Sequence, residues 1–247
     1  MVSRQILLGL RSRLAGVQEL MDGEGLDAAE VAEALRTLGT INRIWGGLLL
    51  MRRELASVLP GVRGPVRILD VATGWADMPR ALARWARHQG LPVEIVCLDH
   101  SEMILKIAAR ESAKDPELRF QQGDALALPF PDGSFDVVTA SLVLHHMEGD
   151  GAVRLLTEAW RVARRAVIIN DLRRGILPYL VSTAALYLLS KNRLIRSDGL
   201  LSVRRSYTAQ EMLALARQAG WKMARARRYA FFRLALVGLK DGPGGPP

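Results

Sequence analysis

Short apolar runs alternate with amphipathic stretches through the middle of the chain. Each apolar run is short enough to be a buried strand, and each stretch that follows repeats its apolar residues with the spacing of a helix. The predicted strands cover residues 66–70, 93–98, 118–121, 135–141 and 166–170. Buried strands that alternate with helices are typical of an α/β domain, in which a parallel sheet is covered on both faces.

The C-terminal part of the chain departs from this alternation. Residues 176–189 are almost wholly apolar and are flanked on both sides by arginine and lysine. This run is too short to span a bilayer, and it lacks the polar face of an ordinary surface helix. Asp198 and Gly199 then predict a turn, and the spacing of Thr208 and Glu211 predicts a capping box at the start of another helix. The last two predicted strands form a hairpin at the sheet edge and cover 221–228 and 231–239.

The N-terminal segment favours helices. Apolar residues recur with helical spacing up to Leu14 and again over 31–38. A third helix is predicted over 41–59, where Gly46 and Gly47 either weaken the helix or mark a close contact. The predicted organisation is a helical extension over 1–60, an α/β domain over 61–241 with an apolar insertion at about 174–200, and a disordered tail over 242–247.

Residues 66–77 carry the most informative pattern, V-R-I-L-D-V-A-T-G-W-A-D. A strand ends near Asp70, a turn of small residues follows, and Asp77 is placed to cap the next helix. Small side chains let a ligand approach the backbone, and the helix start offers free N–H groups. The dinucleotide fingerprint G-x-G-x-x-G has the same outline, but only Gly74 matches it well. A carboxylate at Asp70 would repel a pyrophosphate, whereas it suits the ammonium group and sulfonium centre of S-adenosylmethionine.

Polar residues also follow the next three predicted strands. Asp99 ends the second strand, where a carboxylate can accept both hydroxyl hydrogens of a ribose, and His100 comes next. Asp124 follows the third strand and can accept a hydrogen bond from an adenine amino group. Ser141 ends the fourth strand. Because the carboxyl ends of the strands line one crevice in an open α/β sheet, we expect these side chains to surround a single nucleoside.

Four motifs occur in order: I-L-D-V-A-T-G-W-A-D, V-C-L-D-H-S-E-M, G-D-A-L-A-L-P-F-P-D-G-S-F-D-V-V and S-L-V-L-H-H. Over roughly residues 66–171, the chain resembles the class I S-adenosylmethionine-dependent methyltransferases. The closest likeness is to the small-molecule group that includes the ubiquinone/menaquinone biosynthesis methyltransferases. The resemblance implies an α/β fold with a Rossmann-like, seven-stranded, mostly parallel sheet, helices on both faces and an N-terminal helical extension that covers the cofactor and acceptor site. It also implies S-adenosyl-L-methionine as the cofactor.

The resemblance assigns cofactor contacts by motif position. Asp70 and Gly74 would flank the methionine part, Asp99 the ribose, and Asp124 and Ala125 the adenine. The complete set of predicted cofactor-binding residues is Asp70, Ala72, Gly74, Trp75, Asp99, His100, Asp124, Ala125 and Ser141. The chain departs from the family pattern at three places: Ala72 and Ala76 replace two usual glycines, Trp75 replaces a small or hydroxyl residue, and Arg164-Arg165-Ala166 replaces Pro-Gly-Gly.

The amino-acid composition limits the classes of binding partner and the cellular compartment that we expect. Lysine and arginine number 34 against 25 aspartate and glutamate residues, for a net charge of +9. No basic run is interleaved with aromatic residues, so no nucleic acid is expected as a partner. The positive net charge is then explained either by solvated arginines or by binding to an anionic lipid surface. The single Cys97 excludes an internal disulfide and fits a reducing compartment. No cluster has metal-ligand spacing, and no signal peptide is visible. We predict no metal and a cytoplasmic location, with weak association at a membrane surface as a further expectation.

His145 is the candidate general base, because it follows the fourth strand near the expected methyl group. Asn170 and Asp171 are alternative groups on the acceptor side, and a carbon or nitrogen acceptor needs no strong base. The predicted function is methylation, at oxygen or carbon, of a small lipophilic acceptor such as a phenol or a polyketide-derived or prenylated molecule. Two alternatives stay open: a dinucleotide-dependent oxidoreductase, and a methyltransferase-like protein that binds without catalysis. The sequence gives no basis for predicting the oligomeric state.

Overall fold

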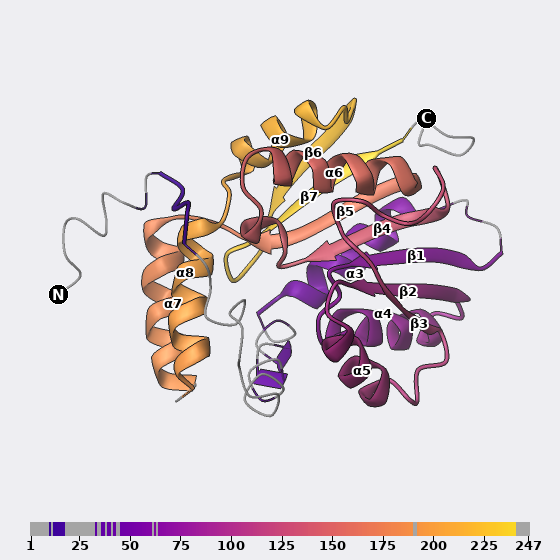
Figure 1. Cartoon of the computed structure of the whole chain (residues 1–247), viewed down its shortest axis with the longest axis horizontal. Helices are drawn as coiled ribbons and strands as arrows, with labels where there is room; N and C mark the ends of the chain where they lie inside the picture. Colours follow the sequence, from indigo (N-terminus) through magenta and orange to yellow (C-terminus); the bar gives the residue numbers. More distant parts are fainter. Residues whose placement is uncertain are drawn as a thin grey trace.

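A seven-stranded sheet forms the centre of the molecule (Figure 1). The computed structural model describes residues 10, 12–17, 33, 36–37, 39–40, 42, 45–60, 62, 64–189 and 192–240. The strands are β1 (Val66–Val71), β2 (Val93–Asp99), β3 (Leu118–Gln122), β4 (Phe135–Ser141), β5 (Ala163–Leu172), β6 (Met223–Arg228) and β7 (Arg233–Leu239). Their order is β3-β2-β1-β4-β5-β7-β6, and β7 is antiparallel to both of its neighbours. The predicted Rossmann-like, mostly parallel sheet with a hairpin at its edge is therefore confirmed.

Helices cover both faces of this sheet, as predicted. One face carries α3 (Gly47–Val58), α4 (Asp77–His88) and α5 (Glu102–Glu111), and the other carries α6 (Asp150–Val162) and α9 (Ala209–Gln218). Each face has its own cluster of buried apolar side chains. Successive residues of a strand point to opposite faces, so Leu69 packs under α6 and α9 while Ile68 packs under α3 and α4. Burial on both sides explains why the strands are apolar runs without alternation.

Of the two helix caps predicted from the sequence, the one at Thr208 is confirmed and the one at Asp77 is wrong. Ser101 caps α5, with its hydroxyl oxygen accepting from the Ile104 N–H at 3.3 Å. The capping box at Thr208 forms as predicted. The prediction that Asp77 caps α4 is wrong, because the cap position is occupied by Ala76 in the left-handed conformation. The Asp77 carboxylate instead accepts a hydrogen bond from the Asn42 side chain at 3.2 Å.

The apolar insertion forms a hairpin of two helices, α7 (Ile176–Leu189) and α8 (Arg193–Arg205), that stands beside the sheet in Figure 1. The predicted turn at Asp198 and Gly199 is wrong, since both residues lie inside α8. Gly199 serves packing there: a Cβ atom on it would lie 2.6 Å from Leu186 Cδ1 of α7. Within the described part of the chain, no helix has the length and apolar character needed to cross a membrane.

The N-terminal segment is only partly described. Residues 12–17 are irregular, so the helical expectation for Leu14 is wrong; its N–H donates to the Arg204 carbonyl at 3.1 Å. The third predicted helix begins at Gly47 rather than at residue 41, because Gly46 has a left-handed φ of 79°. Gly47 marks a close contact with Asn42. Most of the predicted helix over 31–38 and the whole tail over 242–247 lie outside the described residues.

Candidate active site

The turn after β1 has an unusual backbone. Ala72, Gly74 and Ala76 all have positive φ angles, of 53°, 53° and 54°. Residues with a side chain rarely adopt this left-handed region, because the Cβ atom crowds the backbone. The loop therefore keeps a conformation that suits glycine, although two of its three left-handed positions carry alanine. A Cβ atom on Gly74 would meet nothing within 4 Å, so the space next to this residue is open to a ligand.

Asp70 lies beneath this loop and is only 3% exposed. Its carboxylate accepts hydrogen bonds from the hydroxyls of Thr73, at 2.8 Å, and Thr139, at 2.6 Å. Burial raises the pKa of Asp70 to about 7, and the two hydroxyls offset only part of this effect. A buried carboxylate with this pKa is poorly compensated within the protein. It fits a cationic ligand beside the loop and does not fit a pyrophosphate.

Asp99 connects the end of β2 to the same loop. Its Oδ2 accepts from the Gly74 N–H at 2.9 Å, and its Oδ1 accepts from the Ser101 N–H at 3.1 Å. The structure thus brings together two predicted site residues that lie far apart in the sequence. A carboxylate has about four acceptor positions, so Asp99 can still accept two ribose hydroxyls. The exposed His100 ring places Nδ1 at 3.4 Å from Asp99 Oδ1.

The predicted adenine residues lie next to Asp99. The Gly123 N–H donates to the Asp99 carbonyl at 3.0 Å, which puts Asp124 and Ala125 beside the end of β2. Asp124 Oδ1 accepts from the Leu126 N–H at 2.8 Å.

The Trp75 ring is buried, and the guanidinium groups of two arginines lie over it at 5.3 and 5.5 Å. It lines a cavity of about 300 Å³ on the α4 side, together with Arg36, Arg80, Arg84 and Glu111.

The ends of β4 and β5 bring the predicted catalytic residue to the same edge. His145 lies in the short helix η2 (Leu144–His146) and is 2% exposed. Its Nδ1 is 2.6 Å from Asp171 Oδ1, and its backbone N–H donates to Asp171 Oδ2 at 3.0 Å. Burial raises the pKa of Asp171, but the charge of His145 and its hydrogen bonds outweigh this and hold that pKa below its usual range. In a neutral imidazole, a carboxylate at Nδ1 would keep the ring proton on that nitrogen and hold the ring in one orientation.

Three arginines at this edge of the sheet were not predicted from the sequence. Arg13 donates to the carbonyls of His145 and Met147, both at 2.8 Å, and Arg205 donates to the His146 carbonyl at 2.8 Å. These arginines hold η2 in place from the N-terminal segment and from α8. Arg233 is almost fully buried near Asp77 and Asp171, whose charges act on it. Thr139 differs from these arginines, because its place beside Asp70 follows directly from the pairing of β1 with β4.

The comparisons with known proteins agree with this geometry. A family model described as a methyltransferase domain matches residues 68–166. The demethylmenaquinone methyltransferase of Thermus thermophilus is 43% identical over 101 residues, which cover 40% of this chain and 44% of the relative. The ubiquinone/menaquinone biosynthesis C-methyltransferase UbiE of Ectopseudomonas mendocina is 31% identical over 135 residues, which cover 53% of this chain and 51% of the relative. The chain spans about half the length of the curated relatives it matches.

A solved structure supports the fold. The S-adenosylmethionine-dependent methyltransferase from Aquifex aeolicus superposes with a TM-score of 0.59 at 15% identity, and the match covers 87% of this chain and 99% of that one. The likeness to this structure concerns the fold alone, whereas the family model and the curated relatives concern the sequence of the domain. Over residues 68–166, they confirm the predicted methyltransferase domain and its S-adenosylmethionine cofactor. The chain carries a class I S-adenosylmethionine-dependent methyltransferase domain, and this domain resembles the ubiquinone/menaquinone biosynthesis group.

Proposed function

We propose that this protein transfers a methyl group from S-adenosylmethionine to a small lipophilic acceptor, at oxygen or at carbon. The cofactor supplies an electrophilic methyl group on a sulfonium sulfur. The residues of the chain bind this cofactor, align the acceptor and remove its proton. The observation that carries the proposal is the His145–Asp171 pair, with Nδ1 and Oδ1 at 2.6 Å, at the same sheet edge as the cofactor-compatible Asp70 and Asp99.

The cofactor is assigned to the ends of β1, β2 and β3. Asp99 would accept the ribose hydroxyls, and Asp124 with Ala125 would contact the adenine. The methionine part would lie in the open space at Gly74, above the buried Asp70. The carboxylate of Asp70 favours the positive charge of the ammonium and sulfonium groups without a direct contact. Ser141, at the end of β4, comes next along the sheet edge.

His145 would act on the acceptor. When bound, S-adenosylmethionine would supply the methyl group, and His145 would take the proton that the acceptor loses. Asp171 orients the ring and stabilises the imidazolium that forms. This role requires a hydroxyl or another acidic proton on the acceptor.

The helical hairpin supports a lipophilic acceptor. The apolar side chains of α7 that are between 37% and 85% exposed are Ile176, Leu177, Leu180, Val181, Tyr187 and Leu188. The C-terminal end of α8 is attached to η2 through Arg205, so the hairpin is joined to the element that carries His145. The names of the relatives indicate quinone acceptors in those proteins, which supports a phenolic acceptor here. An acceptor of this kind would be taken from a membrane surface.

Turnover is tested with S-adenosylmethionine and three acceptors: a prenylated 1,4-naphthohydroquinone, a prenylated phenol and a polar catechol. Mass spectrometry measures the gain of one methyl group. We expect methylation of a prenylated acceptor and micromolar binding of S-adenosylhomocysteine, with no binding of NADH. Binding of NADH in place of S-adenosylhomocysteine would favour an oxidoreductase. Cofactor binding without turnover on any acceptor would favour a binding protein.

Membrane contact is tested with anionic phosphatidylglycerol vesicles at low and high salt. We expect binding at low salt only, and weaker binding when Leu177 and Leu188 are both changed to Ser. Met223→Ser is the matched control, because Met223 is 43% exposed and lies on β6 at the opposite edge of the sheet. Equal binding of all three proteins would remove α7 from the membrane contact.

A further inference from the structure

Two buried polar side chains at the sheet edge carry atoms without hydrogen bonds. Arg233 is 2% exposed, and its Nε and Nη1 have no hydrogen-bond partner among the residues that the structure describes. Asn170 is 0% exposed; its Nδ2 donates to Ser141 Oγ at 3.3 Å, but its Oδ1 likewise has no partner in the described part of the chain. A buried polar atom without a hydrogen bond destabilises the folded state, so a group of them calls for a physical explanation.

The two side chains are neighbours on one face of the sheet. Asn170 pairs with Ala235 and Leu172 pairs with Arg233 in the β5–β7 ladder. Alternate residues of a strand share a face, so Asn170 and Arg233 are diagonal neighbours, typically about 7–8 Å apart. Ala235 belongs to the cluster packed under α3 and α4, which identifies the face. An acceptor atom and two donor nitrogens therefore lie near one another with no protein partner in the described chain.

Their place in the strand order puts them on the acceptor side. The assigned cofactor residues lie at the ends of β3, β2, β1 and β4, with Ser141 the last of them. Asn170 is one strand further, directly opposite Ser141, and Arg233 is two strands further. A group that receives the methyl must lie just beyond the cofactor. In the strand order, Asn170 and Arg233 are buried polar residues that follow Ser141 in this direction.

The charge of Arg233 indicates the ligand chemistry. Burial lowers the pKa of the guanidinium to about 10, against the raising effect of the Asp171 and Asp77 charges, so the group stays charged at neutral pH. A buried cation with unpaired N–H donors is satisfied best by an oxyanion or a carbonyl oxygen. Asn170 Oδ1 needs a donor, such as a hydroxyl. The pair is complementary to a ligand that carries both groups.

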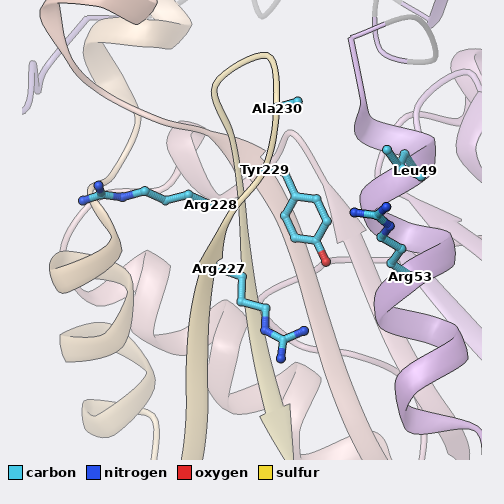
Figure 2. A pocket seen from close by; sticks show the side chains of 6 residues that line it. All are labelled: Leu49, Arg53, Arg227, Arg228, Tyr229 and Ala230. Atoms are coloured by element: carbon cyan, nitrogen blue, oxygen red, sulfur yellow. The ribbon is translucent and has the colours of Figure 1, made fainter.

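A cavity of about 460 Å³ lies on the same face, between α3 and the β6–β7 turn (Figure 2). Its lining includes Leu49 and Arg53 of α3, and Figure 2 shows the Tyr229 ring directed from the hairpin toward that helix. The Tyr229 N–H donates to the Arg233 carbonyl at 2.9 Å, so the cavity adjoins the Arg233 backbone. The cavity thus lies beside the backbone that carries Arg233, although neither Arg233 nor Asn170 is among its lining residues.

We propose that Arg233 and Asn170 form the subsite that recognises the oxygens of the methyl acceptor. The guanidinium binds a phenolate, enolate or carbonyl oxygen, and Asn170 Oδ1 accepts a hydrogen bond from a second hydroxyl. The acceptor class is a flat, dioxygenated molecule such as a hydroquinone or an enolised diketone. This inference rests on the proposed methyl transfer and adds the part of the acceptor that is recognised.

The test compares anaerobic binding of 1,4-dihydroxynaphthalene and 1,4-dimethoxynaphthalene in the presence of saturating S-adenosylhomocysteine. The two probes share a ring system, but the dimethyl ether cannot ionise or donate a hydrogen bond. We expect the unmodified protein to prefer the dihydroxy probe by about ten-fold or more. Arg233→Met should abolish the preference, Asn170→Leu should reduce it, and Arg233→Lys should retain part of it. A preference that is absent from the unmodified protein, or unchanged in Arg233→Met, would overturn the inference.

Thermal unfolding separates this role from a structural one. Methionine replaces a buried, incompletely paired charge with an apolar chain, so Arg233→Met should unfold at a higher temperature than the unmodified protein. If Arg233 served the fold, the same change would lower the unfolding temperature. A lower unfolding temperature together with an intact probe preference would contradict the proposal on both measurements.

A second comparison tests whether Arg233 binds the carboxylate of the cofactor instead of an oxygen of the acceptor. S-adenosylhomocysteine and its decarboxylated analogue differ only in the carboxylate. We expect Arg233→Met to bind both as the unmodified protein does. A selective loss of S-adenosylhomocysteine affinity would assign Arg233 to the cofactor carboxylate and overturn the inference. Methyl transfer by the unmodified protein is measured separately, so failure of this subsite remains distinct from failure of the proposed function.

Discussion

The buried carboxylate of Asp70 provides the sharpest test of how binding and stability are related here. Asp70 is 3% exposed, and its pKa is about 7 in the folded protein against an ordinary value of 3.8. The folded state therefore binds this proton more tightly than the unfolded state. Stability is lost as the pH rises from about 4 to about 7, and it stays lower above that range. The difference between the two pKa values corresponds to roughly 4 kcal/mol at pH 8, as an upper estimate.

Asp70→Asn removes the charge and keeps the shape. The Thr73 hydroxyl can still donate to the amide oxygen, and Thr139 can accept from the new NH₂ group while it donates to the Leu69 carbonyl, 3.4 Å away. No hydrogen bond need be lost. For a chain of this size we expect the unfolding temperature to rise by about 5–15 °C at pH 8, and by less than half of that at pH 5. Calorimetry or circular dichroism at the two pH values measures the effect.

Binding should change in the opposite direction. The charge of Asp70 favours a cation at the loop, so Asp70→Asn should weaken S-adenosylmethionine binding by about ten-fold at pH 8. S-adenosylhomocysteine lacks the sulfonium charge and should lose less affinity. Isothermal titration with both ligands measures the contrast. Reduced stability of Asp70→Asn at pH 8, or an equal stability difference at pH 5 and pH 8, would refute the reasoning about the buried charge. Equal losses for the two ligands would refute a role in recognising the sulfonium group.

Three further predictions concern other parts of the molecule. Asp99→Ala should weaken S-adenosylhomocysteine binding by about ten-fold or more, because the ribose and the Gly74 N–H both lose a charged acceptor; normal binding by a folded variant would remove Asp99 from the site. His145→Gln should lower turnover on a hydroxyl acceptor by about 10²–10⁴ without changing cofactor affinity, and an unchanged rate and pH profile would exclude His145 as the base. Gly199→Ala should destabilise the protein by about 1–3 kcal/mol, because its Cβ would lie 2.6 Å from Leu186 Cδ1. Adding Leu186→Ala should recover part of that loss in thermal unfolding; without any recovery, the packing explanation fails.

The sequence by itself determined the sheet and the cofactor edge. Buried strands are apolar along their whole length, so β1, β2 and β4 could be placed within about a residue of their ends. The carboxyl ends of parallel strands meet at one edge, so the sequence alone predicts that Asp70 and Asp99 lie near one another, and the Asp99 charge indeed acts on Asp70. Local signals such as the capping box at Thr208 also held, since they depend only on residues a few positions apart.

Tertiary structure decided everything that depends on distant segments. Asp198 and Gly199 have the composition of a turn, but packing of α7 against α8 outweighs that local preference and keeps both residues helical. Ala72 and Ala76 adopt left-handed φ angles that their own side chains disfavour, because the fold around them imposes the loop. Arg233 reaches the sheet edge only through the antiparallel pairing of β7 with β5. Its role could not be read from the chain, because burial, neighbouring charge and an unpaired donor are properties of the folded surroundings and not of the residue.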